Sequence, residues 1–398
     1  MAPVKICMIV FNEFRPDMRV YNEAVMLGRQ DNFEVNIIAL KKREEVPEEE
    51  TMRGGVSVKR IAVTERELHL NFFSPLYHTK TMPLIYHRVR EEHSDIYHCH
   101  DIYTLPLGVK LKHSEGARVV YDAHEPDYGT FMAAKPAFGL PPSVRRTAAN
   151  IYERASAAKL DRMIVTTEFA KQAKLDLGYS VHIDVIPYRA NPEFFKPELI
   201  SEDLQEKYRG KRVIIFIGNI GETKGFFQML EAFKTVRQEV KNAFLLIAGE
   251  VVSWLEHETK IKEMGLTDCV EVTGYMPYWD VAPYVNLAEV GLMLSSEDMP
   301  NYRLTLPNKI MDYMACGKPF IGSKLPQVQK IVEEEHCGIL VDSMKPDQIA
   351  SAMLELLNDR SKARKMGERG LKAVSGNYSW EAIEKRLIKI YKGLTNKD

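Results

Sequence analysis

The stretch from Leu304 to Val328, LTLPNKIMDYMACGKPFIGSKLPQV, combines features that suit the binding of an anion. Apolar residues recur at helical spacing after Pro307, whose missing N–H costs nothing in the first turn of a helix. We therefore predict a helix that begins near Asn308 and stops at Gly317. The unpaired N–H groups at the start of a helix that follows a parallel strand suit a phosphorylated ligand. We interpret the stretch as a cradle for a diphosphate.

Two histidines and an aspartate in the run HCHD, residues 98 to 101, form a second group with possible chemistry. His98 and His100 share one face of an expected strand, and Asp101 follows at its end. Zinc binds such side chains, but ligands on one extended strand rarely close a coordination sphere without distant partners. We therefore predict no metal site, and we place His100 and Asp101 at the edge of a cleft.

A third candidate is GNIGETKG, residues 218 to 225, between a strand-like run and a helical one. It is not a Walker P-loop, because Thr223 and Phe226 stand where the second glycine of that motif would fall. Any phosphate binding by this loop would therefore need another pattern.

Parallel strands and helices are needed to position these groups, and the sequence predicts two sets of them. Apolar strand-like runs alternate with helical patterns through both halves of the chain. Strands separated by helices pair in parallel, which indicates an α/β fold of two tandem Rossmann-like domains. The prolines between Pro187 and Pro197 favour an extended linker. We predict domains at 1–190 and 191–378 facing a central cleft, with a last helix at 379–398 that could cross back to the first domain.

Length and composition exclude several classes of protein. The 398 residues are too many for one core and suit two domains of roughly 150–200 residues. A formal net charge of -1 provides no overall basic field to hold nucleic acid. The five cysteines lack CxxC spacing and fall in or beside apolar runs, which is typical of buried thiols in a reducing cytosol. No apolar run approaches the ~18 residues of a membrane span, and the N-terminus passes straight into a strand, so we expect a cytoplasmic protein.

Three motifs and the tandem layout together resemble one known family. The motifs are VIPYRANPEFFKP, GNIGETKGFFQMLEAF and NKIMDYMACGKPFI. Over nearly its whole length the chain resembles the retaining GT-B glycosyltransferases of family 4, the glycosyl transferases group 1. The resemblance implies transfer of a sugar from a UDP- or GDP-linked donor to a hydroxyl of a glycan, lipid-linked or small-molecule acceptor. It also implies retention of the anomeric configuration and no cofactor or metal, and no DxD motif occurs in the sequence.

The resemblance assigns the donor to the second domain. Lys224 matches one of two cations that hold the diphosphate, and Asn219 stands where the family usually has an arginine. Asp312 matches the carboxylate that accepts hydrogen bonds from the ribose, whereas Leu304 replaces a sugar-binding carboxylate. Main-chain N–H groups of the cradle add to this site. The predicted donor-binding residues are Asn219, Gly221, Lys224, Thr305, Leu306, Asn308, Lys309 and Asp312.

The resemblance assigns the acceptor and one catalytic residue to the first domain. His124, in YDAHEPDYG, matches a histidine that lies beside the reacting sugar and can donate a hydrogen bond or support developing charge. Arg19 either contacts a phosphate or pairs with Asp17 at a helix start. The predicted residues on the cleft and acceptor side are Asp17, Arg19, His100 and Asp101.

Some alternatives stay open. Two stretches rich in aromatic and basic residues, 68–90 and 131–146, either touch a lipid-linked acceptor at the inner face of a membrane or pack as ordinary helices. The chain could also be a GT-B nucleotide-sugar epimerase. The departures at Asn219 and Leu304 further leave open a catalytically silent GT-B binding subunit.

Overall fold

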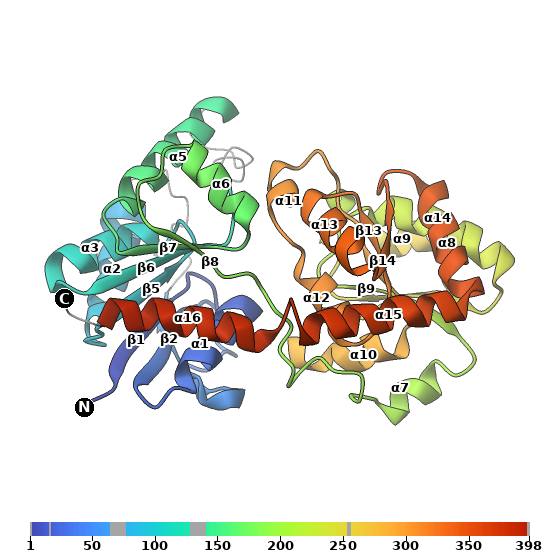
Figure 1. Cartoon of the computed structure of the whole chain (residues 1–398), viewed down its shortest axis with the longest axis horizontal. Coiled ribbons are helices and arrows are strands. Elements are labelled where there is room, and N and C mark those ends of the chain that lie inside the picture. Colours follow the sequence, from blue (N-terminus) through green and yellow to red (C-terminus); the bar gives the residue numbers. More distant parts are fainter. Residues whose placement is uncertain (1, 16, 64–76, 128–140, 253–255, 396–398) are drawn as a thin grey trace. The chain divides into compact units, whose positions relative to one another are not determined.

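The computed structural model describes residues 2–15, 17–63, 77–127, 141–252 and 256–395 (Figure 1). The chain forms two compact units, the first made of Met1–Pro187 with Glu381–Asp398 and the second of Tyr188–Trp380. The division falls at the start of the stretch between Pro187 and Pro197. The last helix, α16 (Trp380–Thr395), lies almost entirely within the first unit.

The first unit is built on an eight-stranded sheet in the order β3-β4-β2-β1-β5-β6-β7-β8. Its only antiparallel pair among the described residues is β3 with β4, and the other neighbours are parallel. The order of the strands reverses between β1 and β5, where doubly wound sheets bind their ligands. The strands are β1 (Val4–Ile9), β2 (Phe33–Lys41), β3 (Glu49–Thr51), β4 (Ser57–Ala62), β5 (Ile96–His100), β6 (Arg118–Ala123), β7 (Arg162–Val165) and β8 (Ile183–Val185).

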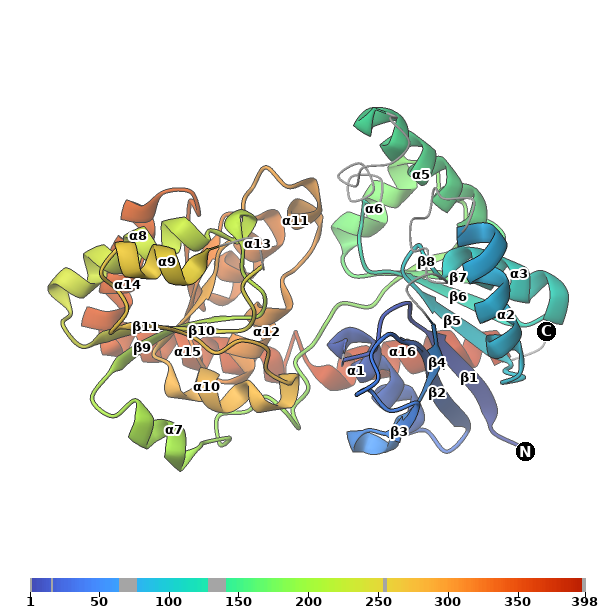
Figure 2. The same cartoon turned by 180° about the vertical axis from the view of Figure 1, so that it is seen from behind.

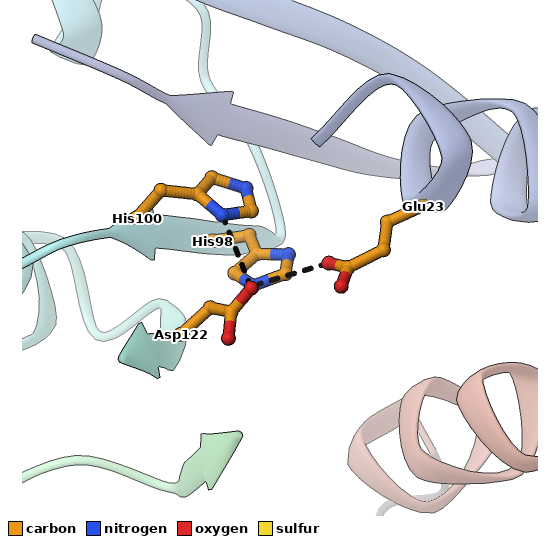
Figure 3. Close-up of side chains that lie close together, drawn as sticks. All are labelled: Glu23, His98, His100 and Asp122. Atoms are coloured by element: carbon orange, nitrogen blue, oxygen red, sulfur yellow. Dashed lines mark ion pairs between the residues drawn. The ribbon is translucent and has the colours of Figure 1, made fainter. Parts of the chain in front are cut away.

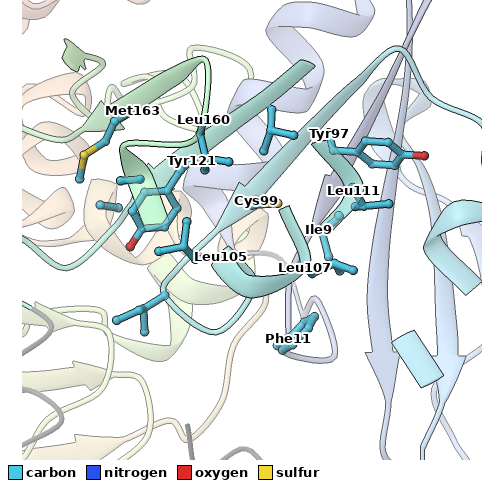
Figure 4. Packing of buried hydrophobic residues seen from close by; sticks show 14 of the residues in the cluster. Ile9, Phe11, Tyr97, Cys99, Leu105, Leu107, Leu111, Tyr121, Leu160 and Met163 are labelled. Atoms are coloured by element: carbon cyan, nitrogen blue, oxygen red, sulfur yellow. The ribbon is translucent and has the colours of Figure 1, made fainter. Parts of the chain in front are cut away.

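Helices cover both faces of this sheet, as a parallel sheet requires. On one face, side chains such as Ile9, Tyr97, Cys99 and Tyr121 form a hydrophobic core with α2, α3 and α5 (Figure 4). The other face is covered by α1 and α16, which lie side by side (Figures 1 and 2). The helical segments are α1 (Met18–Gly28), η1 (Arg53–Gly55), η2 (Tyr77–Thr81), α2 (Met82–Arg90), α3 (Leu105–Glu115), α5 (Pro142–Ala157), α6 (Glu168–Asp176) and α16.

The described part of the stretch 68–90 is packed into the core. It forms η2 and α2, and Tyr77, Ile85 and Tyr86 are buried there, so this part follows the alternative of ordinary helix packing. Residues 68–76 and 131–140 lie outside the described residues. Across the described ranges, no helix is both long enough and apolar enough to cross a membrane.

The second unit has a six-stranded parallel sheet in the order β11-β10-β9-β12-β13-β14. This order also reverses in the middle, between β9 and β12, as in a Rossmann fold. The strands are β9 (Arg212–Ile217), β10 (Ala243–Ala248), β11 (Val270–Val272), β12 (Val290–Met293), β13 (Phe320–Ser323) and β14 (Gly338–Val341). The helical segments are α7 (Glu202–Lys207), η3 (Glu222–Lys224), α8 (Phe226–Glu239), α9 (His257–Glu263), η4 (Tyr278–Asp280), α10 (Ala282–Leu287), α11 (Pro300–Leu304), α12 (Asn308–Ala315), α13 (Pro326–Glu335), α14 (Pro346–Asn358) and α15 (Arg360–Ser375).

Helix α12 confirms the boundaries predicted for the cradle. It begins at Asn308 directly after Pro307, and the chain turns away at Gly317, whose φ is 65°. One difference is the short helix α11, which the sequence analysis did not anticipate ahead of the cradle.

A buried tyrosine ties α12 to the two central strands. The Tyr313 hydroxyl accepts a hydrogen bond from the N–H of Ile217 at 3.2 Å and lies 3.0 Å from the carbonyl oxygen of Leu292, to which it donates. Its ring packs on Gly291, where a Cβ atom would lie 2.7 Å from the ring. Because Gly291 has no side chain, the Tyr313 ring can pack there. This contact holds α12 where the strand order reverses, between β9 and β12.

Candidate functional site

A short loop follows β9 in the second unit and is fixed to the segment after β12. Gly225, with φ 67°, turns the chain from η3 into α8. The N–H of Ser296 donates to the carbonyl oxygen of Thr223 at 2.8 Å, and the hydroxyls of Thr223 and Tyr302 lie 3.4 Å apart. The loop that carries Lys224 is thus held at the carboxyl ends of the central strands.

Two lysine side chains, Lys224 and Lys309, form the electrostatic centre of this region. Lys224 Nζ donates to the carbonyl oxygen of Asn219 at 2.8 Å, and Lys309 Nζ lies 3.5 Å from the centroid of the Phe216 ring. Within the described ranges, neither ammonium forms an ion pair with a carboxylate. Burial lowers the pKa of Lys224, and burial together with repulsion from Lys224 holds the pKa of Lys309 well below its usual range. Asp312 attracts Lys309 and opposes this lowering of its pKa, but neither ammonium has a carboxylate at ion-pair distance among the described residues. A bound anion would therefore stabilise the charged forms of both lysines.

The main-chain donors predicted for the cradle are mostly available. In the described part of the chain, no hydrogen bond uses the N–H groups of Leu306, Asn308 and Lys309. The prediction for Thr305 is wrong, because its N–H donates to the carbonyl oxygen of Asn301 at 3.1 Å. The cause is α11, whose last turn captures this group.

Gly221 and Asn219 occupy different environments in the loop. Asn219 is exposed, and its side chain is open to a ligand. Gly221 is buried, and its carbonyl oxygen accepts a hydrogen bond from the N–H of Lys224 at 3.1 Å. Gly221 therefore shapes the loop, and its role toward a ligand stays a prediction.

Asp312 is buried beneath two tyrosines that the sequence analysis missed. Its Oδ1 accepts hydrogen bonds from the hydroxyls of Tyr188 at 2.8 Å and Tyr278 at 2.7 Å, and the two hydroxyls also contact each other. Burial raises the pKa of Asp312 to about 8, although Tyr188 and Lys309 oppose the shift. No hydrogen bond from the described residues reaches Oδ2. Ribose binding by Asp312 stays a prediction, and Oδ2 is the oxygen that would serve it.

In the first unit, Arg19 has neither of the two roles considered for it, a contact with a phosphate or an ion pair with Asp17. Asp17 caps α1 by accepting a hydrogen bond from the Arg19 N–H at 3.2 Å. The guanidinium instead donates from Nε and Nη2 to the two oxygens of Asp122, each at 2.8 Å, and from Nη1 to the carbonyl oxygen of Ile186 at 2.6 Å. Arg19 is buried, so the structure places it as an anchor between α1 and the sheet rather than as a phosphate ligand.

His124 directly follows β6, and Nε2 of its ring faces the buried Asp122. Its Nε2 lies 3.2 Å from Asp122 Oδ2, while Nδ1 lies 3.8 Å from a carboxylate oxygen of both Asp17 and Asp101. Burial alone would lower the pKa of His124, but the surrounding carboxylates raise it to about 10. The side chain of His124 keeps 16% of its surface exposed.

His100 does not lie at an edge, and this prediction is corrected. Its side chain is fully buried, with Nδ1 3.4 Å from Asp122 Oδ2 (Figure 3). The reason is that β5 is a central strand and this residue points to the face that α1 and α16 cover. Asp101, the next residue, keeps about a third of its side chain exposed (34%) and has a positive φ of 67°.

The structure therefore brings Asp17, Asp101 and His124 together at the carboxyl ends of β5 and β6. The buried Asp122 contacts both His124 and Arg19 and so links this group to Arg19. The sequence analysis did not identify Asp122 as part of the site. Asp122 and His124 are two positions apart, so alternation along an extended chain would have placed both on one face. That spacing was the available signal.

Two family models match the chain. The model described as Glycosyltransferase Family 4 matches residues 18–193, and the one described as Glycosyl transferases group 1 matches residues 201–373. The chain belongs to the family 4 glycosyltransferases. The prediction made from the sequence motifs is thereby confirmed at the level of the family.

Curated relatives of this family 4 glycosyltransferase carry several specificities. A D-inositol 3-phosphate glycosyltransferase of Segniliparus rotundus is 26% identical over 308 residues, which cover 74% of this chain and 65% of the relative. A GDP-mannose-dependent mannosyltransferase of Mycobacterium tuberculosis, named for phosphatidylinositol monomannoside, is 24% identical over 54% of this chain and 57% of its own length. The chain thus spans less than two thirds of either relative.

Solved structures confirm the GT-B fold predicted for this glycosyltransferase. A sucrose-phosphate synthase from Thermosynechococcus elongatus superposes with a TM-score of 0.76 at 19% identity, covering 98% of this chain and 99% of that one. HepE from Anabaena, solved in complex with UDP-glucose, gives a TM-score of 0.74 at 14% identity with the same coverage. At these identities the likeness establishes the fold alone.

Proposed function

We propose that this protein transfers a sugar from a nucleotide-diphosphate sugar to an acceptor hydroxyl, with retention of the anomeric configuration and without a metal ion in the chemical step. The second unit binds the donor, and the first binds a glycan, a lipid-linked or a small-molecule acceptor. The observation that carries the proposal is the pair Lys224 and Lys309, two lysines with no carboxylate at ion-pair distance among the described residues, beside the open N–H groups of α12. UDP-glucose, present in the HepE complex, and GDP-mannose, in the name of the mycobacterial relative, each carry two negative phosphates that suit this pair.

The chemistry follows from where charge develops. As the glycosidic bond breaks, negative charge accumulates on the leaving diphosphate, where the two ammonium groups and the helix N–H groups stabilise it. The acceptor hydroxyl attacks from the same face, and an oxygen of the leaving phosphate takes its proton. His124 donates a hydrogen bond to the reacting sugar.

Donor choice can be found by a thermal-shift screen over UDP-, GDP-, ADP- and dTDP-linked sugars. A ligand present at 100 times its dissociation constant stabilises a folded protein by ~2.7 kcal/mol, which raises the melting temperature measurably. We expect at least one nucleotide sugar and its free nucleoside diphosphate to produce such a rise. A screen in which no nucleotide ligand changes the melting temperature would contradict the proposal.

Removing either lysine of the pair is expected to weaken nucleotide binding. Loss of a charge-assisted contact with phosphate costs about 1.5–3 kcal/mol, so Lys224→Ala and Lys309→Ala should each raise the dissociation constant of the nucleoside diphosphate by roughly 10- to 150-fold. Titration calorimetry measures this directly. Lys330→Ala, which removes an exposed lysine of the same unit, is the matched control and should bind as the wild type does. Wild-type affinity in either site variant would remove that lysine from the donor site.

The variant Asp312→Asn distinguishes the roles of the two carboxylate oxygens of Asp312. The amide oxygen can still accept from Tyr188 and Tyr278, while the amide nitrogen replaces the acceptor Oδ2 with a donor. We expect the wild type to prefer ribose over 2′-deoxyribose nucleoside diphosphates by about 1–2 kcal/mol and the variant to lose that preference. Asp312→Glu restores the usual group of the family and should keep it. An unchanged preference in Asp312→Asn would refute ribose recognition by this residue.

A further inference from the structure

Four buried polar atoms lie close together under α1 in the first unit and lack hydrogen bonds. They are Nε2 of His98, Nε2 of His100 and both carboxylate oxygens of Glu23. All three side chains are buried, with at most 2% of each residue exposed. Glu23 Oε1 forms an ion pair with Arg19 Nη2 at 3.1 Å, so Glu23 Oε2 and the two Nε2 atoms are the ones that need another partner. Buried polar atoms without partners are costly, and native proteins rarely leave several of them together. A ligand in their midst would account for them.

The Nδ1 atom of each imidazole has a polar neighbour, which leaves Nε2 as the atom without one. The Nδ1 atom of His98 lies 2.6 Å from the Tyr391 hydroxyl, on α16. The Nδ1 atom of His100 lies 3.1 Å from Nε2 of His124 and 3.4 Å from Asp122 Oδ2. In the tautomer with the proton on Nδ1, His98 donates to the Tyr391 hydroxyl and His100 to Asp122, and each ring presents the lone pair of Nε2, as metal-binding histidines usually do.

The Glu23 carboxylate reaches toward His98, and His100 and Asp122 lie beside this pair (Figure 3). His98 Nε2 lies 3.9 Å from Glu23 Oε2, and one possible ligand atom from each of Glu23, His98, His100 and Asp122 falls within 4.8 Å of the others. The edges of a tetrahedral zinc site measure about 3.4 Å, given zinc–nitrogen bonds of about 2.0–2.1 Å. A bound ion would therefore shorten these separations by about 0.5–1.4 Å.

The objection raised from the sequence no longer holds. Two histidines on one strand needed distant partners, and the fold supplies Glu23 from α1 and Asp122 from β6. The ring centroids of His98 and His100 lie 4.0 Å apart, with an angle of 31° between the ring planes. Both oxygens of Asp122 already accept hydrogen bonds from Arg19, so Asp122 is better suited to orienting His100 than to binding the ion.

We propose that His98, His100 and Glu23 bind a divalent transition-metal ion, with zinc as the best match to two imidazoles and one carboxylate. Arg19 Nη2 lies 3.1 Å from Glu23 Oε1, which leaves Oε2 for the ion. The ion would cross-link α1 to β5. It stabilises the first unit, takes no part in sugar transfer, and does not depend on the proposed function.

The metal content of the protein tests this site. Untagged protein, produced in zinc-supplemented medium and dialysed against a chelator of modest affinity, is analysed for metals by mass spectrometry. We expect about one zinc ion per chain in the wild type and in His182→Ala, a control that removes an exposed histidine of the same unit. Glu23→Gln and His98→Phe should lose it. A folded wild type without stoichiometric metal would overturn the proposal and indicate that a proton shared by Glu23 and His98 occupies the position.

A second experiment uses only the wild type, so its outcome does not depend on whether the variants fold. The protein is stripped of metal under denaturing conditions and refolded with or without one equivalent of Co²⁺ or Zn²⁺. We expect the visible absorption of Co²⁺ bound by nitrogen and oxygen ligands, its loss when Zn²⁺ is added, and a higher melting temperature with either ion. Equal melting temperatures and no Co²⁺ spectrum would also overturn the proposal.

Discussion

Replacing His124 with alanine is expected to lower the kcat of sugar transfer by about 10²-fold or more and to leave the affinity for nucleoside diphosphate nearly unchanged. This is the scale of losing one preorganised hydrogen-bond donor that acts on the transition state. The nucleotide is assigned to the second unit, so ground-state binding keeps its main contacts. Steady-state kinetics and titration with the nucleoside diphosphate measure the two quantities separately.

Two comparisons make the His124 result interpretable. His182→Ala removes an exposed histidine of the same unit and should keep full activity. His124→Gln retains a hydrogen-bond donor and should recover part of the lost rate. Full activity in a stable His124→Ala protein would remove this residue from the site, and a parallel loss of melting temperature, binding and turnover would mean that it is only structural.

Arg19→Met is expected to reduce the free energy of unfolding by about 3–5 kcal/mol without changing nucleotide affinity. The guanidinium neutralises Asp122 through two hydrogen bonds and lies beside Glu23, and both carboxyl groups are buried. Removing one partner of a buried ion pair leaves the other charge uncompensated. Urea unfolding of the intact protein, with the nucleoside diphosphate titration alongside it, gives both numbers.

Arg88→Met is the matched control for this prediction. Arg88 is exposed and lies 3.8 Å from Glu91 in an ion pair of the same unit, so its loss should cost at most about 1 kcal/mol. If Arg19→Met instead folded as stably as the wild type but bound the nucleotide more weakly, the anchoring role of Arg19 would be refuted. That result would support the alternative role of Arg19 as a phosphate contact.

Patterns that act within a few residues predicted much of this molecule. The alternation of strand-like and helical runs indicated two parallel sheets, because that alternation fixes how strands can be connected. The start of α12 followed from Pro307 and its end from Gly317, since both residues act on the local backbone. The family resemblance rested on motifs of this kind.

Contacts between distant parts of the chain decided what the sequence could not show. Arg19 and Asp122 are 103 positions apart, and no local pattern indicates that one neutralises the other. The burial of His100 depends on α1 and α16 meeting over the same face of β5. Tyr188 meets Asp312 across 124 positions, which is why a carboxyl group that seemed open is already bonded.

The most direct test of the account is whether release of free nucleoside diphosphate depends on an acceptor. The donor found in the screen is incubated with a panel of glycan, lipid-linked and small-molecule acceptors, and the product is analysed by mass spectrometry and NMR. The account predicts release only when a suitable hydroxyl acceptor is present, with a glycoside of retained anomeric configuration in equal amount. Conversion of the donor to an epimer without any acceptor, or tight donor binding with no turnover on any acceptor, would contradict it.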